Sequence, residues 1–266
     1  MSNIRIIPVT TRKGLRAFVN FYYELYKGNK FAVPFLRFDE MNTLSKRKNP
    51  AFEFCEAQYF LAVDGEARIV GRVAAIINRR ANEQWNKKQV RFGWFDFVDD
   101  LEVSQALLNV VEAWGRTKGM TECVGPLGFT DMDREGLLIE GFHHKSTMYI
   151  NYNYPYYKNH MEAMSFYEKD NDWLEYRIKV PEEPPAKFAR TAEMIEKRYN
   201  LHVHKFTSRE LVKGGMGREV FHIVNETYKD LYDFQQLTDS QIDKYVNDYI
   251  KKADLNLVTG VVDGND

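Results

Sequence analysis

The chain has 266 residues, of which 44% are hydrophobic and 14% aromatic, and its formal net charge is −1. This composition can bury the core of one large domain or two small ones, and the balanced charge gives no field that would draw nucleic acid or anionic lipid to the protein as a whole. With two cysteines far apart in the chain, no signal-peptide pattern at the N-terminus and no apolar run of about 20 residues, the sequence predicts a cytoplasmic protein without a disulfide scaffold or a membrane-spanning segment.

The first part of the chain predicts a strand, a helix and a hairpin. Ile4–Val9 is expected to be a short strand, and Arg12–Lys27 is expected to be a helix because its apolar residues share one face. The stretch Asn29–Pro50 predicts irregular structure. Two strand-like segments then follow on either side of an Asp-Gly turn, and they are Gln58–Val63 and Ala67–Asn78.

The stretch Gln89–Gly119 is the centre of this predicted domain. Its first part, Gln89–Val98, alternates and is rich in aromatic residues, which predicts a strand packed on both faces. Asp99–Glu102 has the acidic residues of a helix start, and an apolar face from Val103 predicts an amphipathic helix that ends in a Lys-Gly pair. Thr121–Gly125 predicts the next strand.

The next stretch runs to a proline-rich break. Gly125–Ser146 is rich in turn residues, and Tyr154–Tyr167 predicts a helix that starts beside a proline. Trp173–Val180 alternates and predicts a strand. Pro181–Pro185 contains three prolines, so we expect a domain boundary there.

The part after this break repeats the order of the first part. A helix, a strand, two further helices and a last strand are expected at Ala186–Tyr199, Leu201–Phe206, Val220–Tyr232, Ser240–Lys251 and Leu255–Val262. A Tyr-Lys pair and an Asp-Gly pair, at Tyr26-Lys27 and Asp64-Gly65, recur at Tyr228-Lys229 and Asp263-Gly264. Because the last strand runs into a hairpin turn whose return strand is not in the sequence, we expect the natural chain to continue beyond Asp266.

Three segments of the first part resemble the GNAT (Gcn5-related N-acetyltransferase) superfamily. The hairpin Tyr59–Asn78 resembles its second and third strands, and Gln89–Gly119 resembles its fourth strand with the helix that receives the coenzyme A pyrophosphate. Asn159–Lys169 resembles the helix that ends beside the thioester. The segment with Gly125-Pro126 and Gly136–Phe142 is similar to long bacterial proteins with two tandem GNAT domains, to which bacterial ceramide synthases are related.

The resemblance implies a fold and a domain order. The expected fold is mixed α/β, with a mostly antiparallel central sheet flanked by helices and followed by the start of a second GNAT-like repeat. The expected parts are a GNAT-like domain at 1–180, a linker with a connecting helix at 181–200, and the truncated first part of a second GNAT-like domain at 201–266.

The resemblance also implies acetyl-CoA or a longer acyl-CoA as co-substrate, although the coenzyme turn departs from the family pattern. In the family, Arg/Gln-x-x-Gly-x-Gly/Ala lets backbone N–H groups reach the phosphates. The matching residues Val98–Val103 contain no glycine and three carboxylates. Acids stabilise a helix N-terminus but repel a pyrophosphate, so a simple helix cap is the alternative. The implied cofactor-binding residues are Phe97, Val98, Asp99, Asp100, Leu101 and Asn159.

N-acyl transfer from a thioester needs an acid for the leaving thiolate, a base for the amine proton and donors to the oxyanion. The resemblance places Tyr167 as the acid. Asp96 on the central strand and Glu53 before the hairpin are the candidate bases, and backbone N–H groups near Phe97–Val98 are the candidate oxyanion donors. A half-buried tyrosine and solvated or capping carboxylates are the structural alternatives.

The turn-rich segment after the central helix is expected to line the acceptor site. Its glycines permit close backbone approach, and its carboxylates could bind an ammonium group. The candidate substrate-binding residues are Gly125, Asp131, Asp133, Glu135, Tyr156 and Tyr157. An ordinary insertion loop is the alternative. The six histidines have no cysteine or acid partner at ligand spacing, so no metal is expected.

These observations leave three functions open. The first is an acyl-CoA-dependent N-acyltransferase that acts on a small-molecule or lipid-like amine. The second is a non-catalytic GNAT-fold protein with a degenerate coenzyme A site that binds a ligand or partner, and the acidic turn favours it. The third resembles tRNA-dependent aminoacyltransferases. The near-neutral charge argues against tRNA, because phosphate contacts dominate its binding, so no nucleic-acid partner is expected.

Overall fold

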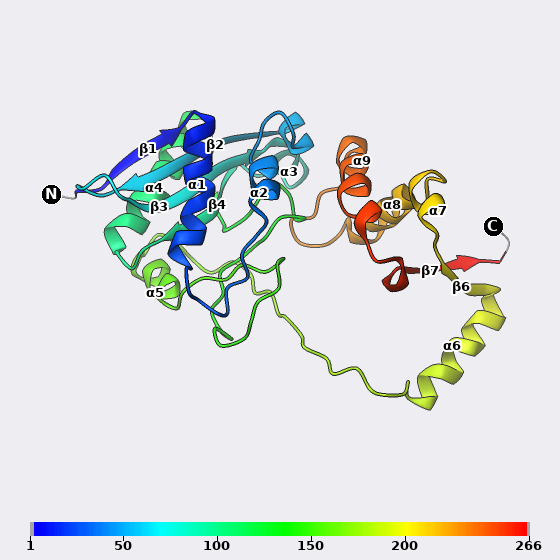
Figure 1. The fold of residues 1–266 in the computed structure, drawn as a ribbon. Coiled ribbons are helices and arrows are strands. Elements are labelled where there is room, and N and C mark those ends of the chain that lie inside the picture. Colours follow the sequence, from blue (N-terminus) through cyan, green and yellow to red (C-terminus); the bar gives the residue numbers. More distant parts are fainter. Residues whose placement is uncertain (1–2, 265–266) are drawn as a thin grey trace. The chain divides into compact units, whose positions relative to one another are not determined.

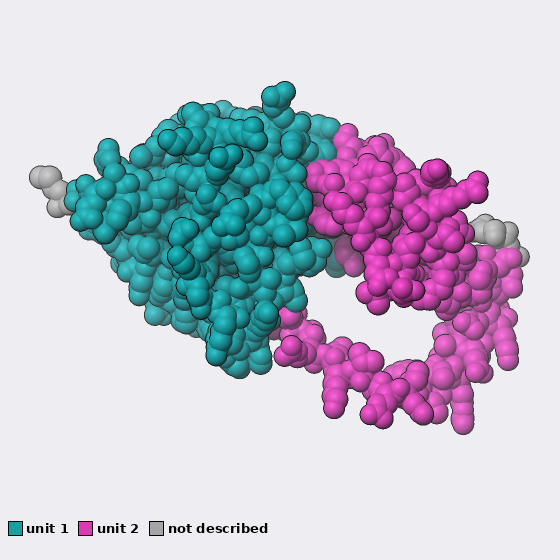
Figure 2. All heavy atoms as spheres, viewed as in Figure 1, with its two compact units in different colours: residues 1–172, 230–235 teal, residues 173–229, 236–266 magenta. Residues whose placement is uncertain are grey.

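A computed structural model describes residues 3–264, which form two compact units. Unit 1 contains residues 3–172 together with Asp230–Gln235, and unit 2 contains Trp173–Lys229 together with residues 236–264; Figure 2 colours the two units separately. The domain limits expected from the sequence stay a prediction. The expected continuation beyond Asp266 lies outside the described residues.

Unit 1 is built on a five-stranded sheet in the order β1-β2-β3-β4-β5 (Figure 1). The strands are β1 Arg5–Val9, β2 Cys55–Val63, β3 Ile69–Asn78, β4 Gln89–Phe97 and β5 Glu122–Val124. All neighbouring pairs are antiparallel except β4 and β5, which are parallel. The expected fold class, a mixed and mostly antiparallel sheet flanked by helices, is confirmed.

Helices α1 (Arg12–Leu25) and α4 (Leu101–Thr117) cover opposite faces of this sheet. On one face, Phe18 and Val19 of α1 pack into the cluster that contains Tyr59 and Ile76. On the other face, the α4 residues Val103, Leu107, Leu108 and Val111 pack with Val73, Phe92 and Phe97. Successive strand side chains point to opposite faces, so both faces of β3 and β4 are buried, as their near-continuous apolar sequence predicts.

Three short helices of unit 1 have no counterpart in the elements expected from the sequence. They are α2 (Arg37–Thr43), the 3-10 helix η1 (Pro50–Glu53) and α3 (Arg79–Gln84). Local capping explains two of them, since Asn49 accepts a hydrogen bond from Ala51 N–H and Asn78 accepts one from Ala81 N–H. Helix α5, Tyr156–Ala163, is shorter than the expected Tyr154–Tyr167.

The expected strand Trp173–Val180 is wrong. These residues have no regular secondary structure, and the alternating apolar side chains are exposed, from 73% for Leu174 to 83% for Val180. The alternation of apolar residues is typical of a strand, but a strand also needs a hydrogen-bonded neighbour. No strand lies beside this segment in the described part of the chain.

Unit 2 consists of short helices and one two-stranded sheet. Its elements are α6 Ala186–Tyr199, β6 Leu201–Lys205, α7 Ser208–Val212, α8 Met216–Tyr228, α9 Asp239–Asp248, η2 Ile250–Lys252, η3 Leu255–Leu257 and β7 Thr259–Asp263. The expected strand Leu255–Val262 therefore begins as a 3-10 turn. Leu201 of β6 pairs with Asp263 of β7, as Arg5 of β1 pairs with Val63 of β2, and this parallel supports the predicted repeat.

A small core holds the helices of unit 2 together, formed by Phe221, Leu237, Ile242 and Val246. Helix α8 ends at Tyr228 rather than at the expected Tyr232, because the chain then turns through Asp233, whose φ is 55°. No helix between residues 3 and 264 combines the length and the apolar composition that crossing a membrane requires.

Candidate active site

A bulge in β4 sets the direction of its side chains. The register with β3 shifts between Arg72/Asp96 and Ala74/Gly93, so Trp94 and Phe95 together lie opposite one residue of β3, and Trp94 has a φ of 46°. Beyond the bulge, Phe95 and Phe97 join the cluster under α4, whereas Asp96 points to the α1 face.

The backbone near the end of β4 is already hydrogen-bonded. Phe97 N–H donates to the hydroxyl of Tyr157 at 3.1 Å, and Val98 N–H donates to the carbonyl of Val70 at 3.0 Å. Tyr157, on α5, is fully buried and lies against the ring of Phe97. Tyr156 beside it donates to the Phe97 carbonyl at 2.5 Å. The two amides predicted to serve an oxyanion are thus engaged by the protein itself.

Asp96 is bound from two sides. Arg72, which is 1% exposed, places Nε and Nη2 at 2.7 Å from Asp96 Oδ2, and Tyr26 donates to Oδ1 at 3.2 Å. The Tyr26 hydroxyl also lies 3.1 Å from that of Tyr157. Burial, followed by the charge of a neighbouring tyrosine, raises the pKa of Tyr26, and burial followed by Asp96 raises that of Tyr157. This geometry favours Asp96 as a structural ion-pair partner over a free base.

The other candidate base, Glu53, is exposed at the end of η1. Within residues 3–264 it shares no hydrogen bond or ion pair with another predicted site residue. The neighbouring Phe52 packs against Phe129 of the turn-rich loop, and the catalytic role of Glu53 stays a prediction.

The acidic turn after β4 caps α4. Asp100 accepts a hydrogen bond from Glu102 N–H at 2.9 Å, and Asp99 lies 3.0 Å from Nε2 of His160. The other ring nitrogen of His160 lies 2.9 Å from the hydroxyl of Ser104, which is fully buried. The predicted cofactor residues Leu101 and Asn159 are exposed. The Leu101 carbonyl accepts a hydrogen bond from the Ser104 hydroxyl of this network at 3.0 Å. The geometry favours the capping alternative over a pyrophosphate site.

Tyr167 lines a cavity of about 210 Å³ along α4. Its hydroxyl donates to Glu112 Oε1 at 2.8 Å, and its ring packs edge-on against Phe92. Burial, followed by the charge of Cys123, raises the pKa of Tyr167, so the phenol is protonated at neutral pH. The lining residues are Gln105, Leu108, Asn109, Glu112, Arg116, Met164, Phe166 and Tyr167.

The loop that follows β5 is tied to β4 by its glycine. Gly125 has a φ of 156° and lies so close to the carbonyl of Phe92 that a side chain there would clash with it, and Leu127 N–H donates to the same carbonyl at 2.9 Å. Asp133 braces the loop from within, accepting from Phe129 N–H at 2.8 Å and from Thr130 N–H at 3.3 Å. Burial raises the pKa of Asp133 to about 6. Asp133 therefore stabilises the conformation of the loop.

Asp131 and Glu135 differ from Asp133 because each has an oxygen without a partner. Asp131 Oδ1 and Glu135 Oε1 are buried atoms that make no hydrogen bond. Burial raises the pKa of Asp131 to about 6, and burial followed by the charges of Asp131 and Asp233 raises that of Glu135 to about 8. Buried oxygens without partners are rare, so these two are the best candidates of the loop for a ligand.

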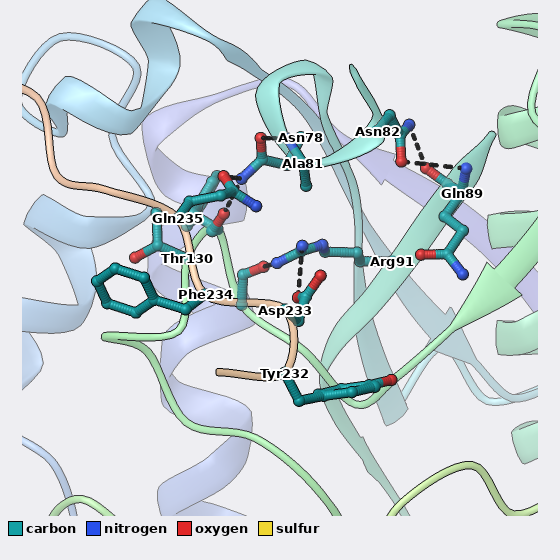
Figure 3. Close-up of polar contacts among 12 residues, drawn as sticks. Asn78, Ala81, Asn82, Gln89, Arg91, Thr130, Tyr232, Asp233, Phe234 and Gln235 are labelled. Atoms are coloured by element: carbon teal, nitrogen blue, oxygen red, sulfur yellow. Dashed lines mark hydrogen bonds and ion pairs between the residues drawn. The ribbon is translucent and has the colours of Figure 1, made fainter. Parts of the chain in front are cut away.

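A segment far along the chain completes this part of unit 1. Residues Asp230–Gln235, here named the strap, lie beside β3 and β4 (Figure 3). Asp233 pairs with Arg91 at 2.6 Å, and both side chains are at least nine-tenths buried. Gln235 accepts from Asn78 Nδ2 at 2.6 Å. Arg91 and the strap are absent from the site residues expected from the sequence; the only local signal is a single arginine in an apolar strand.

Among residues 3–264, no three histidine, cysteine, aspartate or glutamate side chains are placed to hold a metal ion. The carboxylates of the loop lie beside Arg91, whose charge competes with a cation.

Unit 1 is a mixed α/β domain with two partly separate regions: a cavity beside Tyr167 and a carboxylate pair beside the strap. No family model matches the sequence. Bacterial ceramide synthase of Caulobacter vibrioides is 24% identical over 262 residues, which are 97% of this chain and 66% of that protein. Protein YghO of Escherichia coli is 31% identical over 157 residues, 59% of this chain and 40% of that protein. The chain thus matches less than two thirds of the length of either relative.

Two solved structures match parts of the chain with low structural similarity. A GNAT-family acetyltransferase of Staphylococcus aureus matches 44% of this chain and 68% of its own, with 17% identity and a TM-score of 0.32. An acetyltransferase of Pyrococcus furiosus, described as putative, matches 66% of this chain and 99% of its own, with 14% identity and a TM-score of 0.35. The similarity to a bacterial ceramide synthase that the sequence predicted is confirmed over 97% of this chain, and the strand order of unit 1 agrees with the expected mixed, mostly antiparallel sheet.

Proposed function

We propose that the chain serves N-acyl transfer, in which the acyl group of a thioester such as acyl-CoA passes to an amine. The relationship to the ceramide synthase supports this class of reaction. The observation that carries the proposal is Glu135, whose buried Oε1 has no partner and whose pKa is raised to about 8. Such a carboxylate suits the proton transfer that an amine acceptor requires.

On the acceptor side, an alkylammonium bound at Asp131 Oδ1 and Glu135 Oε1 would supply the positive charge that these oxygens lack. Glu135, ionised by the nearby cation, then accepts a proton from the ammonium nitrogen. The neutral amine can attack the carbonyl carbon of the thioester, and the carbon–sulfur bond breaks as the thiolate leaves. The nitrogen loses its second proton as the amide forms, and this proton replaces, through solvent, the one that Tyr167 gives to the thiolate. Asp133 keeps the loop in shape and does not touch the amine.

On the donor side, the cavity beside Tyr167 would hold the end of the thioester. Its volume, about 210 Å³, is smaller than most complete ligand pockets, so it suits one portion of the donor. Tyr167 retains its proton at neutral pH and would donate it to the departing thiolate after turning from Glu112. The acidic turn at Asp99–Glu102 directs the phosphates of the donor away from the N-terminus of α4.

A second function, ligand binding without catalysis, is favoured by the end of β4. The Tyr157 hydroxyl already accepts the hydrogen bond of Phe97 N–H, and Asp100 caps the N-terminus of α4, where a coenzyme would bind. In this case the carboxylate loop would bind an amine and release it unchanged. The tRNA-dependent function and the cytoplasmic location stay predictions.

The test is a calorimetric titration of the full chain with acetyl-CoA and with a long-chain acyl-CoA, followed by an acyl-transfer assay on a panel of primary amines read by mass spectrometry. We expect acyl-CoA binding and an acylated amine. Glu135→Gln should lower kcat/KM by about 10²- to 10⁴-fold, the usual contribution of a general base. Glu140→Gln, an exposed carboxylate of the same loop, is the matched control and should leave kcat/KM unchanged.

Binding of neither acyl-CoA would reject the transfer reaction in favour of ligand binding. Tyr167→Phe separates the two sides of the site: it should lower kcat with little change in the affinity for the amine. Unchanged turnover in this variant would remove Tyr167 from the reaction and leave the role of Glu135 standing.

A further inference from the structure

The strap is held to unit 1 at several points along its length. Gln235 is bound by Asn78 on β3, Asp233 by Arg91 on β4, and the Phe234 carbonyl accepts from Gln84 on α3 at 3.2 Å. The Tyr232 hydroxyl bonds to Asp170. Phe234, Gln235 and Asp233 are buried or nearly so. A segment with this many buried anchors is a fixed part of unit 1.

The strap also touches the carboxylate loop. The backbone N–H of Gln235 donates to Asp131, and the charge of Asp233 acts on both Asp131 and Glu135. The side-chain Nε2 of Gln235 has no hydrogen-bond partner although Gln235 is only 2% exposed. Three polar atoms without partners, one on the strap and two on the loop, therefore occur in segments that touch each other.

The charges around Glu135 come from the loop, from β4 and from the strap. Those that act on it most strongly are, in order, the carboxylates Asp131 and Asp233, the guanidinium of Arg91 and the carboxylate of Asp133. The charge of Glu135 also acts on Tyr232 of the strap. Asp233 in turn interacts electrostatically with Lys87 and Asp170. Arg91 is thus the cation that opposes the carboxylates, and Asp233 is the group that engages it at 2.6 Å.

We propose that the strap forms one wall of the amine site and that its buried ion pair, Asp233 with Arg91, consists of positioning residues that act on Glu135. This inference rests on the proposed function, since it assigns two residues to the site of amine deprotonation. Asp233 adds a negative charge near Glu135 and at the same time pairs with Nη2 of Arg91, whose Nη1 lies 3.5 Å from the Gly128 carbonyl of the loop. The two members of the ion pair therefore act on Glu135 with opposite charges.

Opposite results for two substitutions follow from this arrangement. Asp233→Asn removes a negative neighbour and frees Arg91 to face Glu135, so the titration midpoint of Glu135 should fall by about one pH unit or more. Arg91→Gln removes the cation and leaves Asp233 beside the loop, so the midpoint should rise by a similar amount. A purely structural strap would move both variants in the same direction or leave the midpoint where it is.

The experiment is a pH titration of Glu135 in the full chain by carbon NMR with side-chain-labelled glutamate, the signal being assigned by its loss in Glu135→Gln. Asp230→Asn, an exposed strap carboxylate, is the matched control and should titrate as the parent does. The double variant Asp233→Asn/Arg91→Gln removes both charges at once, so its midpoint should lie between those of the single variants. It keeps the comparison open if one single variant fails to fold.

The titration needs neither thioester nor amine, so it separates this inference from the proposed function. If the two single variants shift the titration midpoint of Glu135 in opposite directions but the protein has no transferase activity, the electrostatic role of the strap is supported. In that case only the proposed transfer reaction is rejected. Shifts of the same sign, or an unmoved midpoint in both single variants, would overturn the inference even if the protein is an active transferase.

Discussion

Strand β4 separates two kinds of interior in unit 1. Toward α4 and α5 its residues Phe92, Phe95 and Phe97 form a closed aromatic cluster with Tyr157. Toward α1 and the loop it presents Arg91 and Asp96, each in a buried ion pair. The first face is filled by the protein itself, whereas the second leads to carboxylate oxygens that have no partner.

The difference teaches where chemistry can occur in this domain. Closed aromatic packing supplies stability through buried apolar area and leaves no free polar group. The charged face has hydrogen-bonding capacity left over at Asp131 and Glu135. The carboxylate chemistry is therefore expected beside the loop and the strap. The aromatic cluster of Phe92, Phe95 and Phe97 is expected to support both this region and the cavity beside Tyr167.

The largest effect is expected at the ion pair inside the charged face. Arg72→Met leaves the carboxylate of Asp96 buried without its cation, so the free energy of unfolding should fall by about 3–5 kcal/mol. Arg68→Met, in an exposed ion pair on the hairpin turn, is the control and should lower the free energy of unfolding much less, because water screens the pair. Urea denaturation measures both. If Arg72→Met and Arg68→Met lower the free energy of unfolding equally, burial does not make the first ion pair more important for stability than the second.

A smaller effect concerns pH and Glu135. Burial and two neighbouring carboxylates raise its pKa from 4.5 to about 8, so the folded protein holds this proton more tightly than the unfolded chain does. The stabilising contribution is complete below pH 4.5 and is lost as the pH rises through about 8. We expect the free energy of unfolding to fall by about 3 kcal/mol over this window.

The comparison that isolates this effect is Glu135→Gln, which cannot lose a proton. Its free energy of unfolding, measured by denaturation at each pH, should decrease less across the same window than that of the parent protein. Parallel curves for the two proteins would show that Glu135 titrates as an ordinary carboxyl group.

The aromatic face can be tested through Tyr157. Tyr157→Phe removes the hydroxyl that accepts from Phe97 N–H and leaves that amide buried, so the free energy of unfolding should fall by about 1–3 kcal/mol. Calorimetric unfolding is the measurement. If the freed amide is an oxyanion donor, acyl-CoA binding should also strengthen in this variant. Unchanged binding together with lower stability would mean that this face is structural.

The smallest effect is expected at the acidic turn. The Asp99 side chain is 66% exposed, so loss of its contact with His160 in Asp99→Asn should change the free energy of unfolding by about 0–1 kcal/mol. Removing one negative charge should strengthen CoA binding by about two- to fivefold at low salt if the phosphates pass near the turn. The same affinity in both proteins, measured by calorimetry, would place the phosphates elsewhere.

Much of the framework follows from local sequence patterns. Alternation predicts β4, the 3.6-residue periodicity predicts α1 and α4, and the Asp-Gly turn predicts the β2–β3 hairpin. Caps are equally local, as the hydrogen bond from Gly14 N–H to Thr11 at the start of α1 shows. The segment Trp173–Val180 shows the limit of such patterns, because alternation states a preference for a strand but does not provide a neighbouring strand.

The site was less predictable for a physical reason. Asp131 and Glu135 stand out by residue type and by the glycines near them, and the structure brings them together. Arg72, Tyr26 and Arg91 owe their roles to partners far along the chain; Arg91 and Asp233 are 142 positions apart. A lone charge in an apolar strand indicates that a partner exists, but nothing local says which residue it is.

The path of the chain through the strap has a consequence for biosynthesis. Arg91 is part of β4, yet the residue that neutralises it leaves the ribosome only after the whole stretch up to Asp233 has been translated. A nascent or proteolytic product that stops at residue 180 therefore lacks the carboxylate with which the buried guanidinium of Arg91 forms its ion pair. Such a fragment is a candidate for chaperone retention, even though every strand of its sheet has already been made.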